Sequence, residues 1–239
     1  MSEELGQVEK PSVEKFKEGR KLYFVPNAYC AENSPDDYLS IFNRYWNQVE
    51  DQLGALELKL GKVSRVYHEL VSSGGEDGVK MVKEINDKSY QVVKNRLDKG
   101  AHLEATEDNE ILTELMDWGR CISIGLQNQG VINRVYNSYT EVSRKRNECI
   151  IGNIDRTLEA DEIGVLFMRE GHRIQFPSDI QVFYVAPPAL DEIDRWFRDN
   201  ELKAAEPEKN EPSEQKEKDE EGEKAGKAEK TGRPDEAES

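Results

Sequence analysis

The sequence has few of the residues that build disulfide frameworks, zinc sites or membrane spans. Its 239 residues include three cysteines, Cys30, Cys121 and Cys149, with no short paired spacing. An odd number of scattered cysteines argues against a disulfide framework and a zinc knuckle, and it predicts a reducing compartment, the cytoplasm. No apolar run approaches the ~18 residues of a spanning helix, and the charged residues 1–10 do not resemble a signal peptide. We therefore expect no membrane-bound part.

Positive charge is also scarce. The chain has 33 Lys and Arg against 49 Asp and Glu, a net charge of −16. Residues 201–239 hold 14 acids and 8 bases, which leaves residues 1–200 with a net charge of −10. Nucleic acid and anionic membrane surfaces repel such a body. We therefore expect neither as a partner, although nucleic-acid binding would fit the pattern of helices and strands described below.

The C-terminal segment lacks the apolar residues that a fold needs. Residues 202–239 contain no aromatic residue, and Leu202 is their one large aliphatic residue. Such a segment cannot offset the entropy lost on folding, and it predicts a disordered acidic tail. Residues 1–20 are polar and predict a loosely ordered lead. The remaining residues 21–201 are enough for a single domain with its own core.

Apolar runs and apolar periodicity alternate along this domain. Short apolar runs predict strands at residues 22–25, 62–67, 163–168 and 182–185, with a very short further strand at 101–104. Apolar residues at steps of three and four predict helices at residues 34–60, 76–97, from a Thr106 cap to Gly130, from there to 158, and around 190–197. Strands separated by helices imply parallel crossovers. We therefore predict an α/β fold with a mainly parallel central sheet covered by helices, and a helical layer, insertion or cap at residues 107–158.

Three histidines are the candidates for chemistry: His68, His102 and His172. Two of them, His68 and His172, follow predicted strands, and ligands of open parallel sheets bind at the carboxyl ends of the strands. Glu69 adjoins His68, and Glu170 precedes His172 by two residues. Imidazole with carboxylate suits acid–base catalysis, and the three histidines also suit a divalent metal site. No other cofactor is indicated.

Each histidine also has a purely structural interpretation. His68 could bond a backbone carbonyl at the end of its strand, and His102 could cap the preceding helix. His172 could be an exposed loop residue. The alternatives stay open for each residue, because the argument for function depends on their sharing one edge of the sheet.

Arg146 interrupts the apolar stripe of the helix that follows Gly130. An arginine on an apolar face needs a charge partner or must extend to water. The two interpretations are a guanidinium directed at a carboxylate or anionic substrate in the site, and an arginine that reaches solvent at the edge of a helix interface.

Residues 144–147 are Arg-Lys-Arg-Asn, the strand 164–168 leads into Gly171-His172, and residues 66–69 supply an earlier strand that ends in histidine. These segments resemble the TraB/erythromycin-esterase-like superfamily. The resemblance covers less than a quarter of the chain. It departs from the family pattern at the residue before His68, at Asn147, and at Arg169 and Arg173, which flank His172. It implies an α/β fold with a helical insertion and His/Glu chemistry of a hydrolytic, sometimes metal-dependent, kind.

Two functions follow from these observations. The first is a hydrolase-like enzyme in which His68 and His172 act as base or ligand, Glu69 and Glu170 orient or protonate, and Arg146 neutralises charge. The second is a non-catalytic interaction or regulatory protein, in which helix 34–60 binds a protein partner and the acidic tail is a solvating segment. Self-association is compatible with either.

Overall fold

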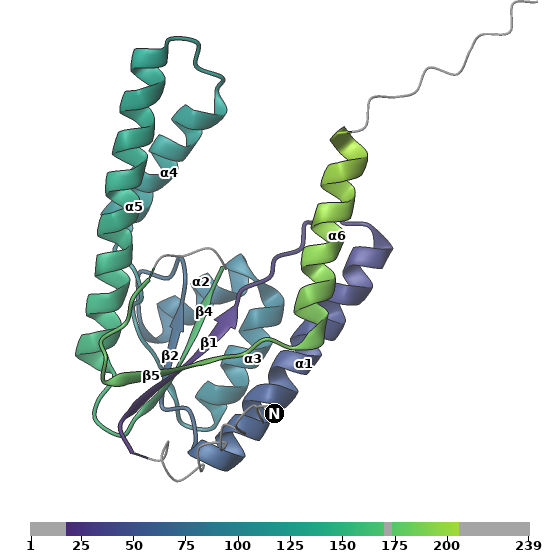
Figure 1. Cartoon of the computed structure of the whole chain (residues 1–239). Helices are drawn as coiled ribbons and strands as arrows, with labels where there is room; N and C mark the ends of the chain where they lie inside the picture. The colour runs from purple at the N-terminus through teal and green to yellow at the C-terminus, as the bar shows by residue number, and fades with distance from the viewer. Residues whose placement is uncertain (1–17, 170–173, 206–239) are drawn as a thin grey trace, which may run out of the picture.

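The structure is a computed structural model that describes residues 18–169 and 174–205. Within these residues it contains five strands and six helices (Figure 1). In chain order they are β1 (Arg20–Pro26), α1 (Asp36–Leu60), β2 (Arg65–His68), α2 (Gly75–Ile85), α3 (Asp87–Asp98), β3 (His102–Leu103), α4 (Asn109–Ser123), α5 (Gln129–Thr157), β4 (Ile163–Met168), β5 (Ile180–Tyr184) and α6 (Pro188–Ala205).

The strands form one parallel sheet in the order β3-β2-β4-β1-β5, which confirms the predicted α/β fold. The central strand β4 has all six residues buried. Its alternate side chains reach opposite faces, with Val165 and Phe167 in one core and Leu166 and Met168 in the other. A strand covered on both faces should be continuously apolar, and this is why residues 163–168 were recognisable as a strand.

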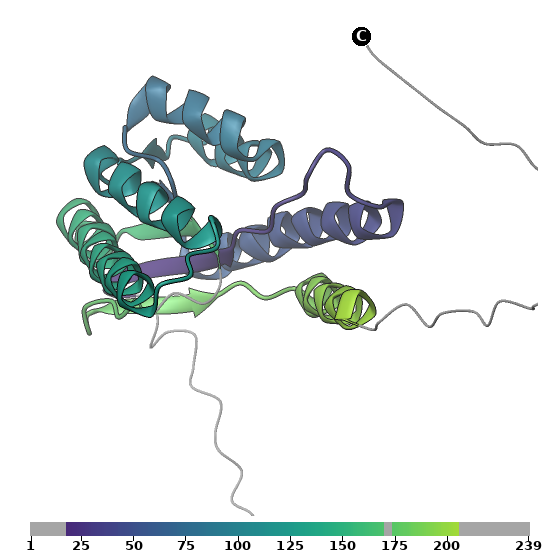
Figure 2. The ribbon, with the colours of Figure 1, turned by 90° about the horizontal axis from the view of Figure 1, so that it is seen from above.

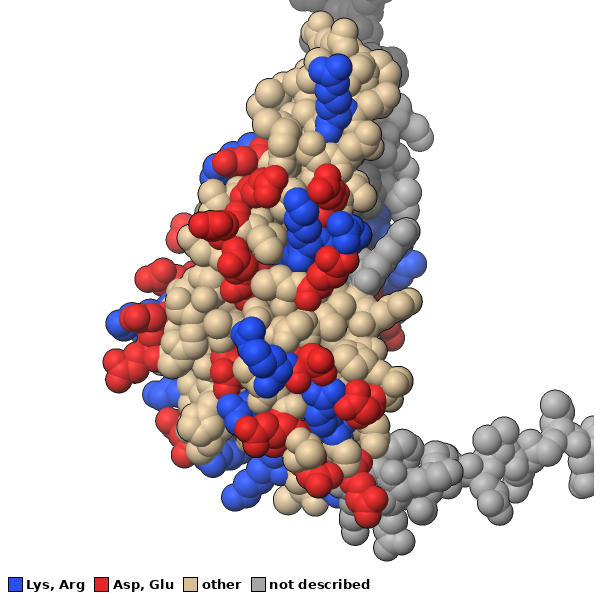
Figure 3. Space-filling view, turned by 90° about the vertical axis from the view of Figure 1, so that its left-hand side faces the viewer, with Lys and Arg blue, Asp and Glu red and all other residues tan. Residues whose placement is uncertain are grey.

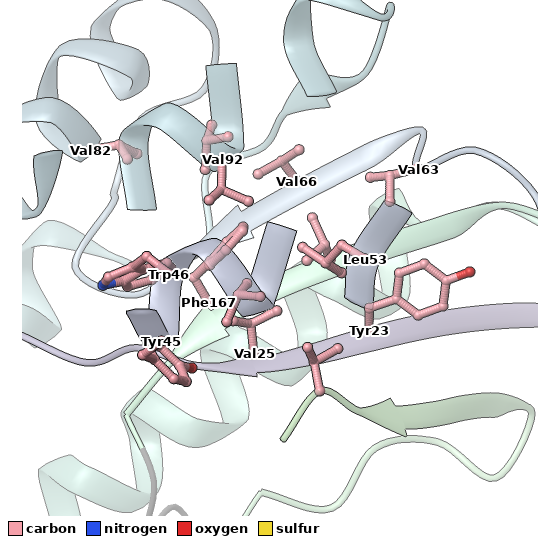
Figure 4. Packing of buried hydrophobic residues seen from close by; sticks show 14 of the residues in the cluster. Tyr23, Val25, Tyr45, Trp46, Leu53, Val63, Val66, Val82, Val92 and Phe167 are labelled. Carbon is pink, nitrogen blue, oxygen red and sulfur yellow. The ribbon is translucent and has the colours of Figure 1, made fainter. Parts of the chain in front are cut away.

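The larger core lies on the face covered by α1, α2, α3 and α6. There α1 presents Tyr45 and Trp46, which pack near Phe167 of β4 and Val25 of β1 (Figure 4). Trp46 lies 6.3 Å from Phe167 between ring centroids. The stripe of α1 that repeats at steps of three and four is therefore the surface that fixes this helix on the sheet.

The smaller core lies on the opposite face, under the second half of α5. Ile150 and Ile154 of that helix pack with Leu22 of β1, Tyr67 of β2 and Leu166 of β4. The first half of α5 extends beyond the sheet and pairs with α4, so the predicted helical layer is a two-helix hairpin.

Two helix pairs flank the carboxyl ends of the strands. In Figure 1 the α4–α5 pair rises on the left and the α1–α6 pair on the right, and Figure 2 views the same arrangement from above. The segments that directly follow β1 and β2 lie between the two pairs. Any site at this edge is therefore bordered by helices from distant parts of the chain.

The expected single helix at residues 76–97 is wrong, because the chain forms two helices that meet at Asn86. This residue has extended backbone angles and ends α2, and its side-chain oxygen accepts the backbone N–H groups of Lys88 and Ser89 to cap α3. Its amide nitrogen donates to Asn27 and to the carbonyl of Ala28. Contacts with the β1 loop therefore accompany the break in an otherwise continuous apolar pattern.

The predicted start of α4 is also wrong. Asp108 caps this helix by accepting the N–H groups of Glu110 and Ile111, whereas the hydroxyl oxygen of Thr106 accepts the backbone N–H of His68 at 2.9 Å. The break between α4 and α5 falls at residues 124–128, so Gly130 lies in the first turn of α5.

The ends of the domain differ slightly from expectation. β1 begins at Arg20, inside the expected lead, and α6 continues to Ala205, beyond the expected end at residue 201. The rest of the expected lead and tail, residues 1–17 and 206–239, lies outside the described residues. Among the residues that the structure describes, no helix is long and apolar enough to span a membrane.

Candidate functional site

Polar side chains converge where three neighbouring strands end. Asn27 follows β1 and Arg169 follows β4. His68 is the last residue of β2, and Glu69 comes directly after it. These strands are adjacent in the sheet, and the ladder pairs Pro26 with Met168 and His68 with Phe167. The parallel register therefore brings these residues to one place, as the sheet-edge argument requires.

The carboxylate of Glu69 is the centre of this cluster. Its side chain is 2% exposed. The Oε1 atom accepts the Tyr29 hydroxyl at 2.8 Å, the backbone N–H of Arg169 at 3.0 Å and the Asn27 amide at 3.2 Å. Two guanidinium groups approach it, with Arg146 at 3.8 Å from Oε2 and Arg169 at 3.8 Å from Oε1.

The environment of Glu69 changes its proton affinity. Burial raises the pKa of the carboxyl above its ordinary value, and the Tyr29 hydroxyl and the two arginines offset this only in part. Burial also raises the pKa of Tyr29, with a further contribution from the charge of Glu69, so the hydroxyl keeps its proton and donates it. A buried carboxyl that is more easily protonated than usual, beside a hydroxyl, is an arrangement suited to proton transfer.

His68 lies behind this cluster and is 0% exposed. Its Nδ1 lies 2.7 Å from the carbonyl oxygen of Glu69, which can only accept, so Nδ1 carries the proton. Its Nε2 lies 3.0 Å from the Ser89 hydroxyl and 3.3 Å from the Asn27 amide. Burial lowers the pKa of His68 to about 4. The ring is therefore neutral near pH 7, and both of its nitrogens already have partners.

Arg146 is tied to the base of the helical hairpin. Its side chain is 11% exposed, and two guanidinium nitrogens donate to the two carboxylate oxygens of Glu107, with Nε at 2.6 Å. Glu107 also accepts the backbone N–H of Leu70 at 2.7 Å. The arginine on an apolar stripe thus has carboxylate partners, Glu107 first and Glu69 second.

A cavity of about 490 Å³ opens beside the cluster. One wall is the segment after β1, including Asn27 and Tyr29, and Arg169 lies at the same side. The Arg169 guanidinium stacks over the Tyr29 ring, 4.5 Å from the ring centroid. The opposite wall comes from helices α1 and α6, through the largely apolar side chains of Tyr38, Leu190, Ile193 and Phe197 and the carboxylate of Asp194. A largely apolar cavity with a few convergent polar groups is the usual form of a small-molecule site.

Of the three candidate histidines, the structure places His68 at this edge and His102 away from it. His102 is exposed and pairs with Arg65 at the amino end of β2. Arg65 precedes His68 by three residues, or about 10 Å along the strand, so His102 lies away from the edge that holds His68. It lines a separate hollow with Lys80 and Leu97. His172 and Glu170 lie outside the described residues, so the expected approach of His172 to His68 stays a prediction.

Two of the three predicted metal ligands, His68 and His102, lie among the residues that the structure describes. The parts of the chain that it describes contain no group of three or more His, Cys, Asp or Glu side chains that could hold a metal ion. Both ring nitrogens of His68 have hydrogen-bond partners, so His68 as placed is not free to coordinate one. We therefore derive no step through a metal.

Several residues of the site were not singled out from the sequence: Asn27, Tyr29, Asn86, Ser89, Glu107 and Arg169. A signal existed for Asn27 and Arg169, because each directly follows a strand and the sheet-edge argument applies to both. For Glu107 and Ser89 no local signal existed, since each joins the cluster through contacts with residues 37 and 21 positions away.

The chain was compared with protein-family models, with curated proteins and with solved structures, and none of the three searches found a match.

Proposed function

We propose that the chain is an acid–base enzyme of the hydrolytic class, with Glu69 as its proton-transfer group and a small molecule as its substrate. The observation that carries the proposal is the position of Glu69: a buried carboxyl with a raised pKa that accepts the hydroxyl of Tyr29, a residue that lines the cavity together with Arg169. Perturbed carboxyls beside cavities are characteristic of catalytic sites. The resemblance of residues 66–69 to a hydrolytic superfamily agrees with this class, and the cysteine pattern agrees with a cytoplasmic location.

The side chains around Glu69 have distinct roles in this proposal. Tyr29 lines the cavity and donates to Glu69, so a proton released at the substrate reaches the carboxylate through the Tyr29 hydroxyl. Arg169 has a side chain that is 59% exposed at the cavity, and its guanidinium stabilises negative charge that develops on the substrate.

His68 and Arg146 are positioning residues in this proposal. The neutral ring of His68 bonds Asn27 and the Glu69 carbonyl, and Arg146 bonds Glu107 and faces Glu69. Neither residue is among the described residues that line the cavity. Each therefore acts on the cavity indirectly, through the side chains that it positions.

The proposal is tested by replacing Glu69 with glutamine. Glutamine preserves the size of the side chain and an acceptor for Tyr29, but it cannot take up a proton. We expect Glu69→Gln to lower kcat by about 10²–10⁴-fold, the usual contribution of one acid–base group. The measurement is turnover of chromogenic ester, amide and phosphoester substrates by the purified full chain.

The matched control is Glu148→Gln. Glu148 is an exposed carboxylate of α5 that pairs with Arg144, away from the cluster, and its replacement should leave turnover unchanged. Full activity of Glu69→Gln with an intact fold would reject the proposal. Absence of turnover in the wild type, with no compound that raises its melting temperature, would reject it as well.

The second candidate is a non-catalytic interaction protein. The predicted binding surface on helix 34–60 is not supported, because α1 buries its stripe on the sheet and against α6. The exposed apolar side chains Met116, Ile124, Val131 and Tyr136 of the α4–α5 hairpin favour this candidate instead.

A further inference from the structure

The hairpin of α4 and α5 extends beyond the rest of the fold. The 29 residues of α5 span about 43 Å at the usual helical rise. Its buried residues Ile150 and Ile154 pack on the sheet, whereas Val135 and Val142 lie in the half that pairs with α4 (Figure 1). Two helices alone cannot enclose a core, so the outer surface of this hairpin carries apolar side chains to solvent.

The end of the hairpin is almost free of charge. Residues 121–140 contain one charged residue, Arg134, although 34% of the whole chain is charged. On the face shown in Figure 3 the upper end is nearly all tan, while red and blue side chains crowd the lower part.

Apolar side chains are exposed on the same hairpin. Ile124 is 71% exposed and Tyr136 is 52% exposed, and Met116 and Val131 are also exposed. A soluble surface that combines exposed apolar side chains with an absence of charge marks an interaction site.

The charge of the chain decides which partner fits. Two copies with a formal charge of −16 repel each other where their charged surfaces meet, and the hairpin end is a surface on which this repulsion is weakest. The helices themselves are complementary, since α4 carries three acids and one base and α5 carries five bases and three acids. A twofold axis that sets α4 of one copy against α5 of the other therefore brings opposite charges together.

We propose that the α4–α5 hairpin is a self-association surface, on which the hairpins of two copies pack as an antiparallel four-helix bundle. The exposed Ile124, Val131 and Tyr136 side chains become its apolar interior. This proposal is independent of the catalytic one, because it concerns the far end of the hairpin and needs no activity at Glu69. A membrane surface is a poorer occupant, since this end of the hairpin offers Arg134 as its one basic residue and the body is acidic.

The test is the mass of the full chain in solution, measured by sedimentation and light scattering over a range of concentrations. We expect a dimer for the wild type. Ile124→Glu combined with Val131→Glu places four carboxylates in the interface of the dimer, and we expect it to raise the dissociation constant at least ~100-fold. Because both side chains are exposed, the melting temperature of the dissociated chain should stay close to that of the wild-type monomer at low concentration.

Leu58→Glu is the matched control. Leu58 is 91% exposed near the C-terminal end of α1, outside the hairpin, and its replacement should leave the dimer intact. A wild type that is monomeric at about 100 μM, a concentration above the dissociation constants of specific complexes, would overturn the proposal. Equal dissociation by Leu58→Glu would also overturn it. Binding of a monomeric wild type, but not of the double variant, to phosphatidylcholine vesicles would assign the surface to a membrane instead.

Discussion

At the scale of single residues, the neutral state of His68 determines what this histidine can do. The ring donates through Nδ1 to a backbone carbonyl, and its Nε2 faces Ser89 and Asn27 in a fully buried position. Protonation would leave a buried charge with no carboxylate side chain bonded to it, which is why the pKa of His68 falls to about 4. Its contribution is to hold the cluster in place in the neutral form.

This state predicts a specific pH dependence of stability. Between pH 6.5 and 4 the unfolded His68 binds a proton that the folded ring does not, so acidification favours unfolding. The neutral ring makes its full contribution to the free energy of unfolding when the pH is above the unfolded pKa. As the pH falls, this contribution decreases by about 3 kcal/mol in all. Urea unfolding of the wild type and of His68→Gln across this range measures it.

The comparison isolates His68, because every other titrating group is common to both proteins. The neighbouring Glu69 acts in the opposite direction: its raised pKa means that the folded state binds the proton more tightly, which stabilises it as the pH falls. If His68→Gln loses as much stability on acidification as the wild type does, the buried neutral ring is not the cause.

At the scale of elements, the base of the α4–α5 hairpin is held by a buried charge group. Arg146 of α5 bonds Glu107, which immediately precedes the cap of α4, and Glu107 bonds the backbone of Leu70 after β2. Leu70 has a positive φ of 65°, an unfavourable conformation for a branched side chain. One carboxylate thus joins both helices of the hairpin to the sheet edge next to Glu69.

Two arginines of the same helix provide a matched prediction at this scale. Arg146→Ala leaves the buried Glu107 without its cation and should cost about 3–5 kcal/mol of unfolding free energy. Arg144→Ala removes an exposed pair with Glu148 and should cost less than about 1 kcal/mol. Denaturant unfolding of the two variants compares them directly. Equal losses of unfolding free energy would show that burial does not strengthen the ion pair between Arg146 and Glu107.

At the scale of the whole molecule, charge and apolar surface are separated. The body and the segment 201–239 carry the negative charge, while the hairpin end carries almost none. The candidate cavity is lined in part by α6. Figures 1 and 2 show α6 and the hairpin on opposite sides of the strand edge. Association through the hairpin would therefore leave the apolar wall of the cavity untouched.

The C-terminal segment predicts an outcome for truncation. Residues 206–239 contain no aromatic or large aliphatic residue, so they have no apolar surface to bury. Deleting them should change the melting temperature by less than about 2 °C, a shift below that of a 1 kcal/mol effect in a domain of this size. Thermal unfolding by circular dichroism measures it.

A longer deletion serves as the comparison for this truncation. Removing α6 as well eliminates the buried residues Leu190 and Ile193 and should lower the melting temperature strongly. A fall of several degrees on deletion of 206–239 alone would show that this segment docks on the domain.

Local patterns predicted most of the elements. The apolar run of β4, the α1 stripe closed by Gly61 and the alternation of strands with helices each depend on residues close in the chain, and all three are confirmed. The break at Asn86 was not predictable in this way, because the partners of its side chain, Asn27 and Ala28, are about 59 residues away.

The sequence by itself determined the fold class and most of the strands and helices along the chain, because side-chain period is a local property. The order of the strands, which brings Asn27, Glu69 and Arg169 to one place, was decided by the tertiary structure. Only the tertiary structure decided that Arg146 faces Glu107 and Glu69, that His68 is buried and neutral, and that His102 lies at the amino end of the neighbouring strand. These outcomes depend on burial and on distances between residues far apart in the chain, and both exist only once the layers have packed.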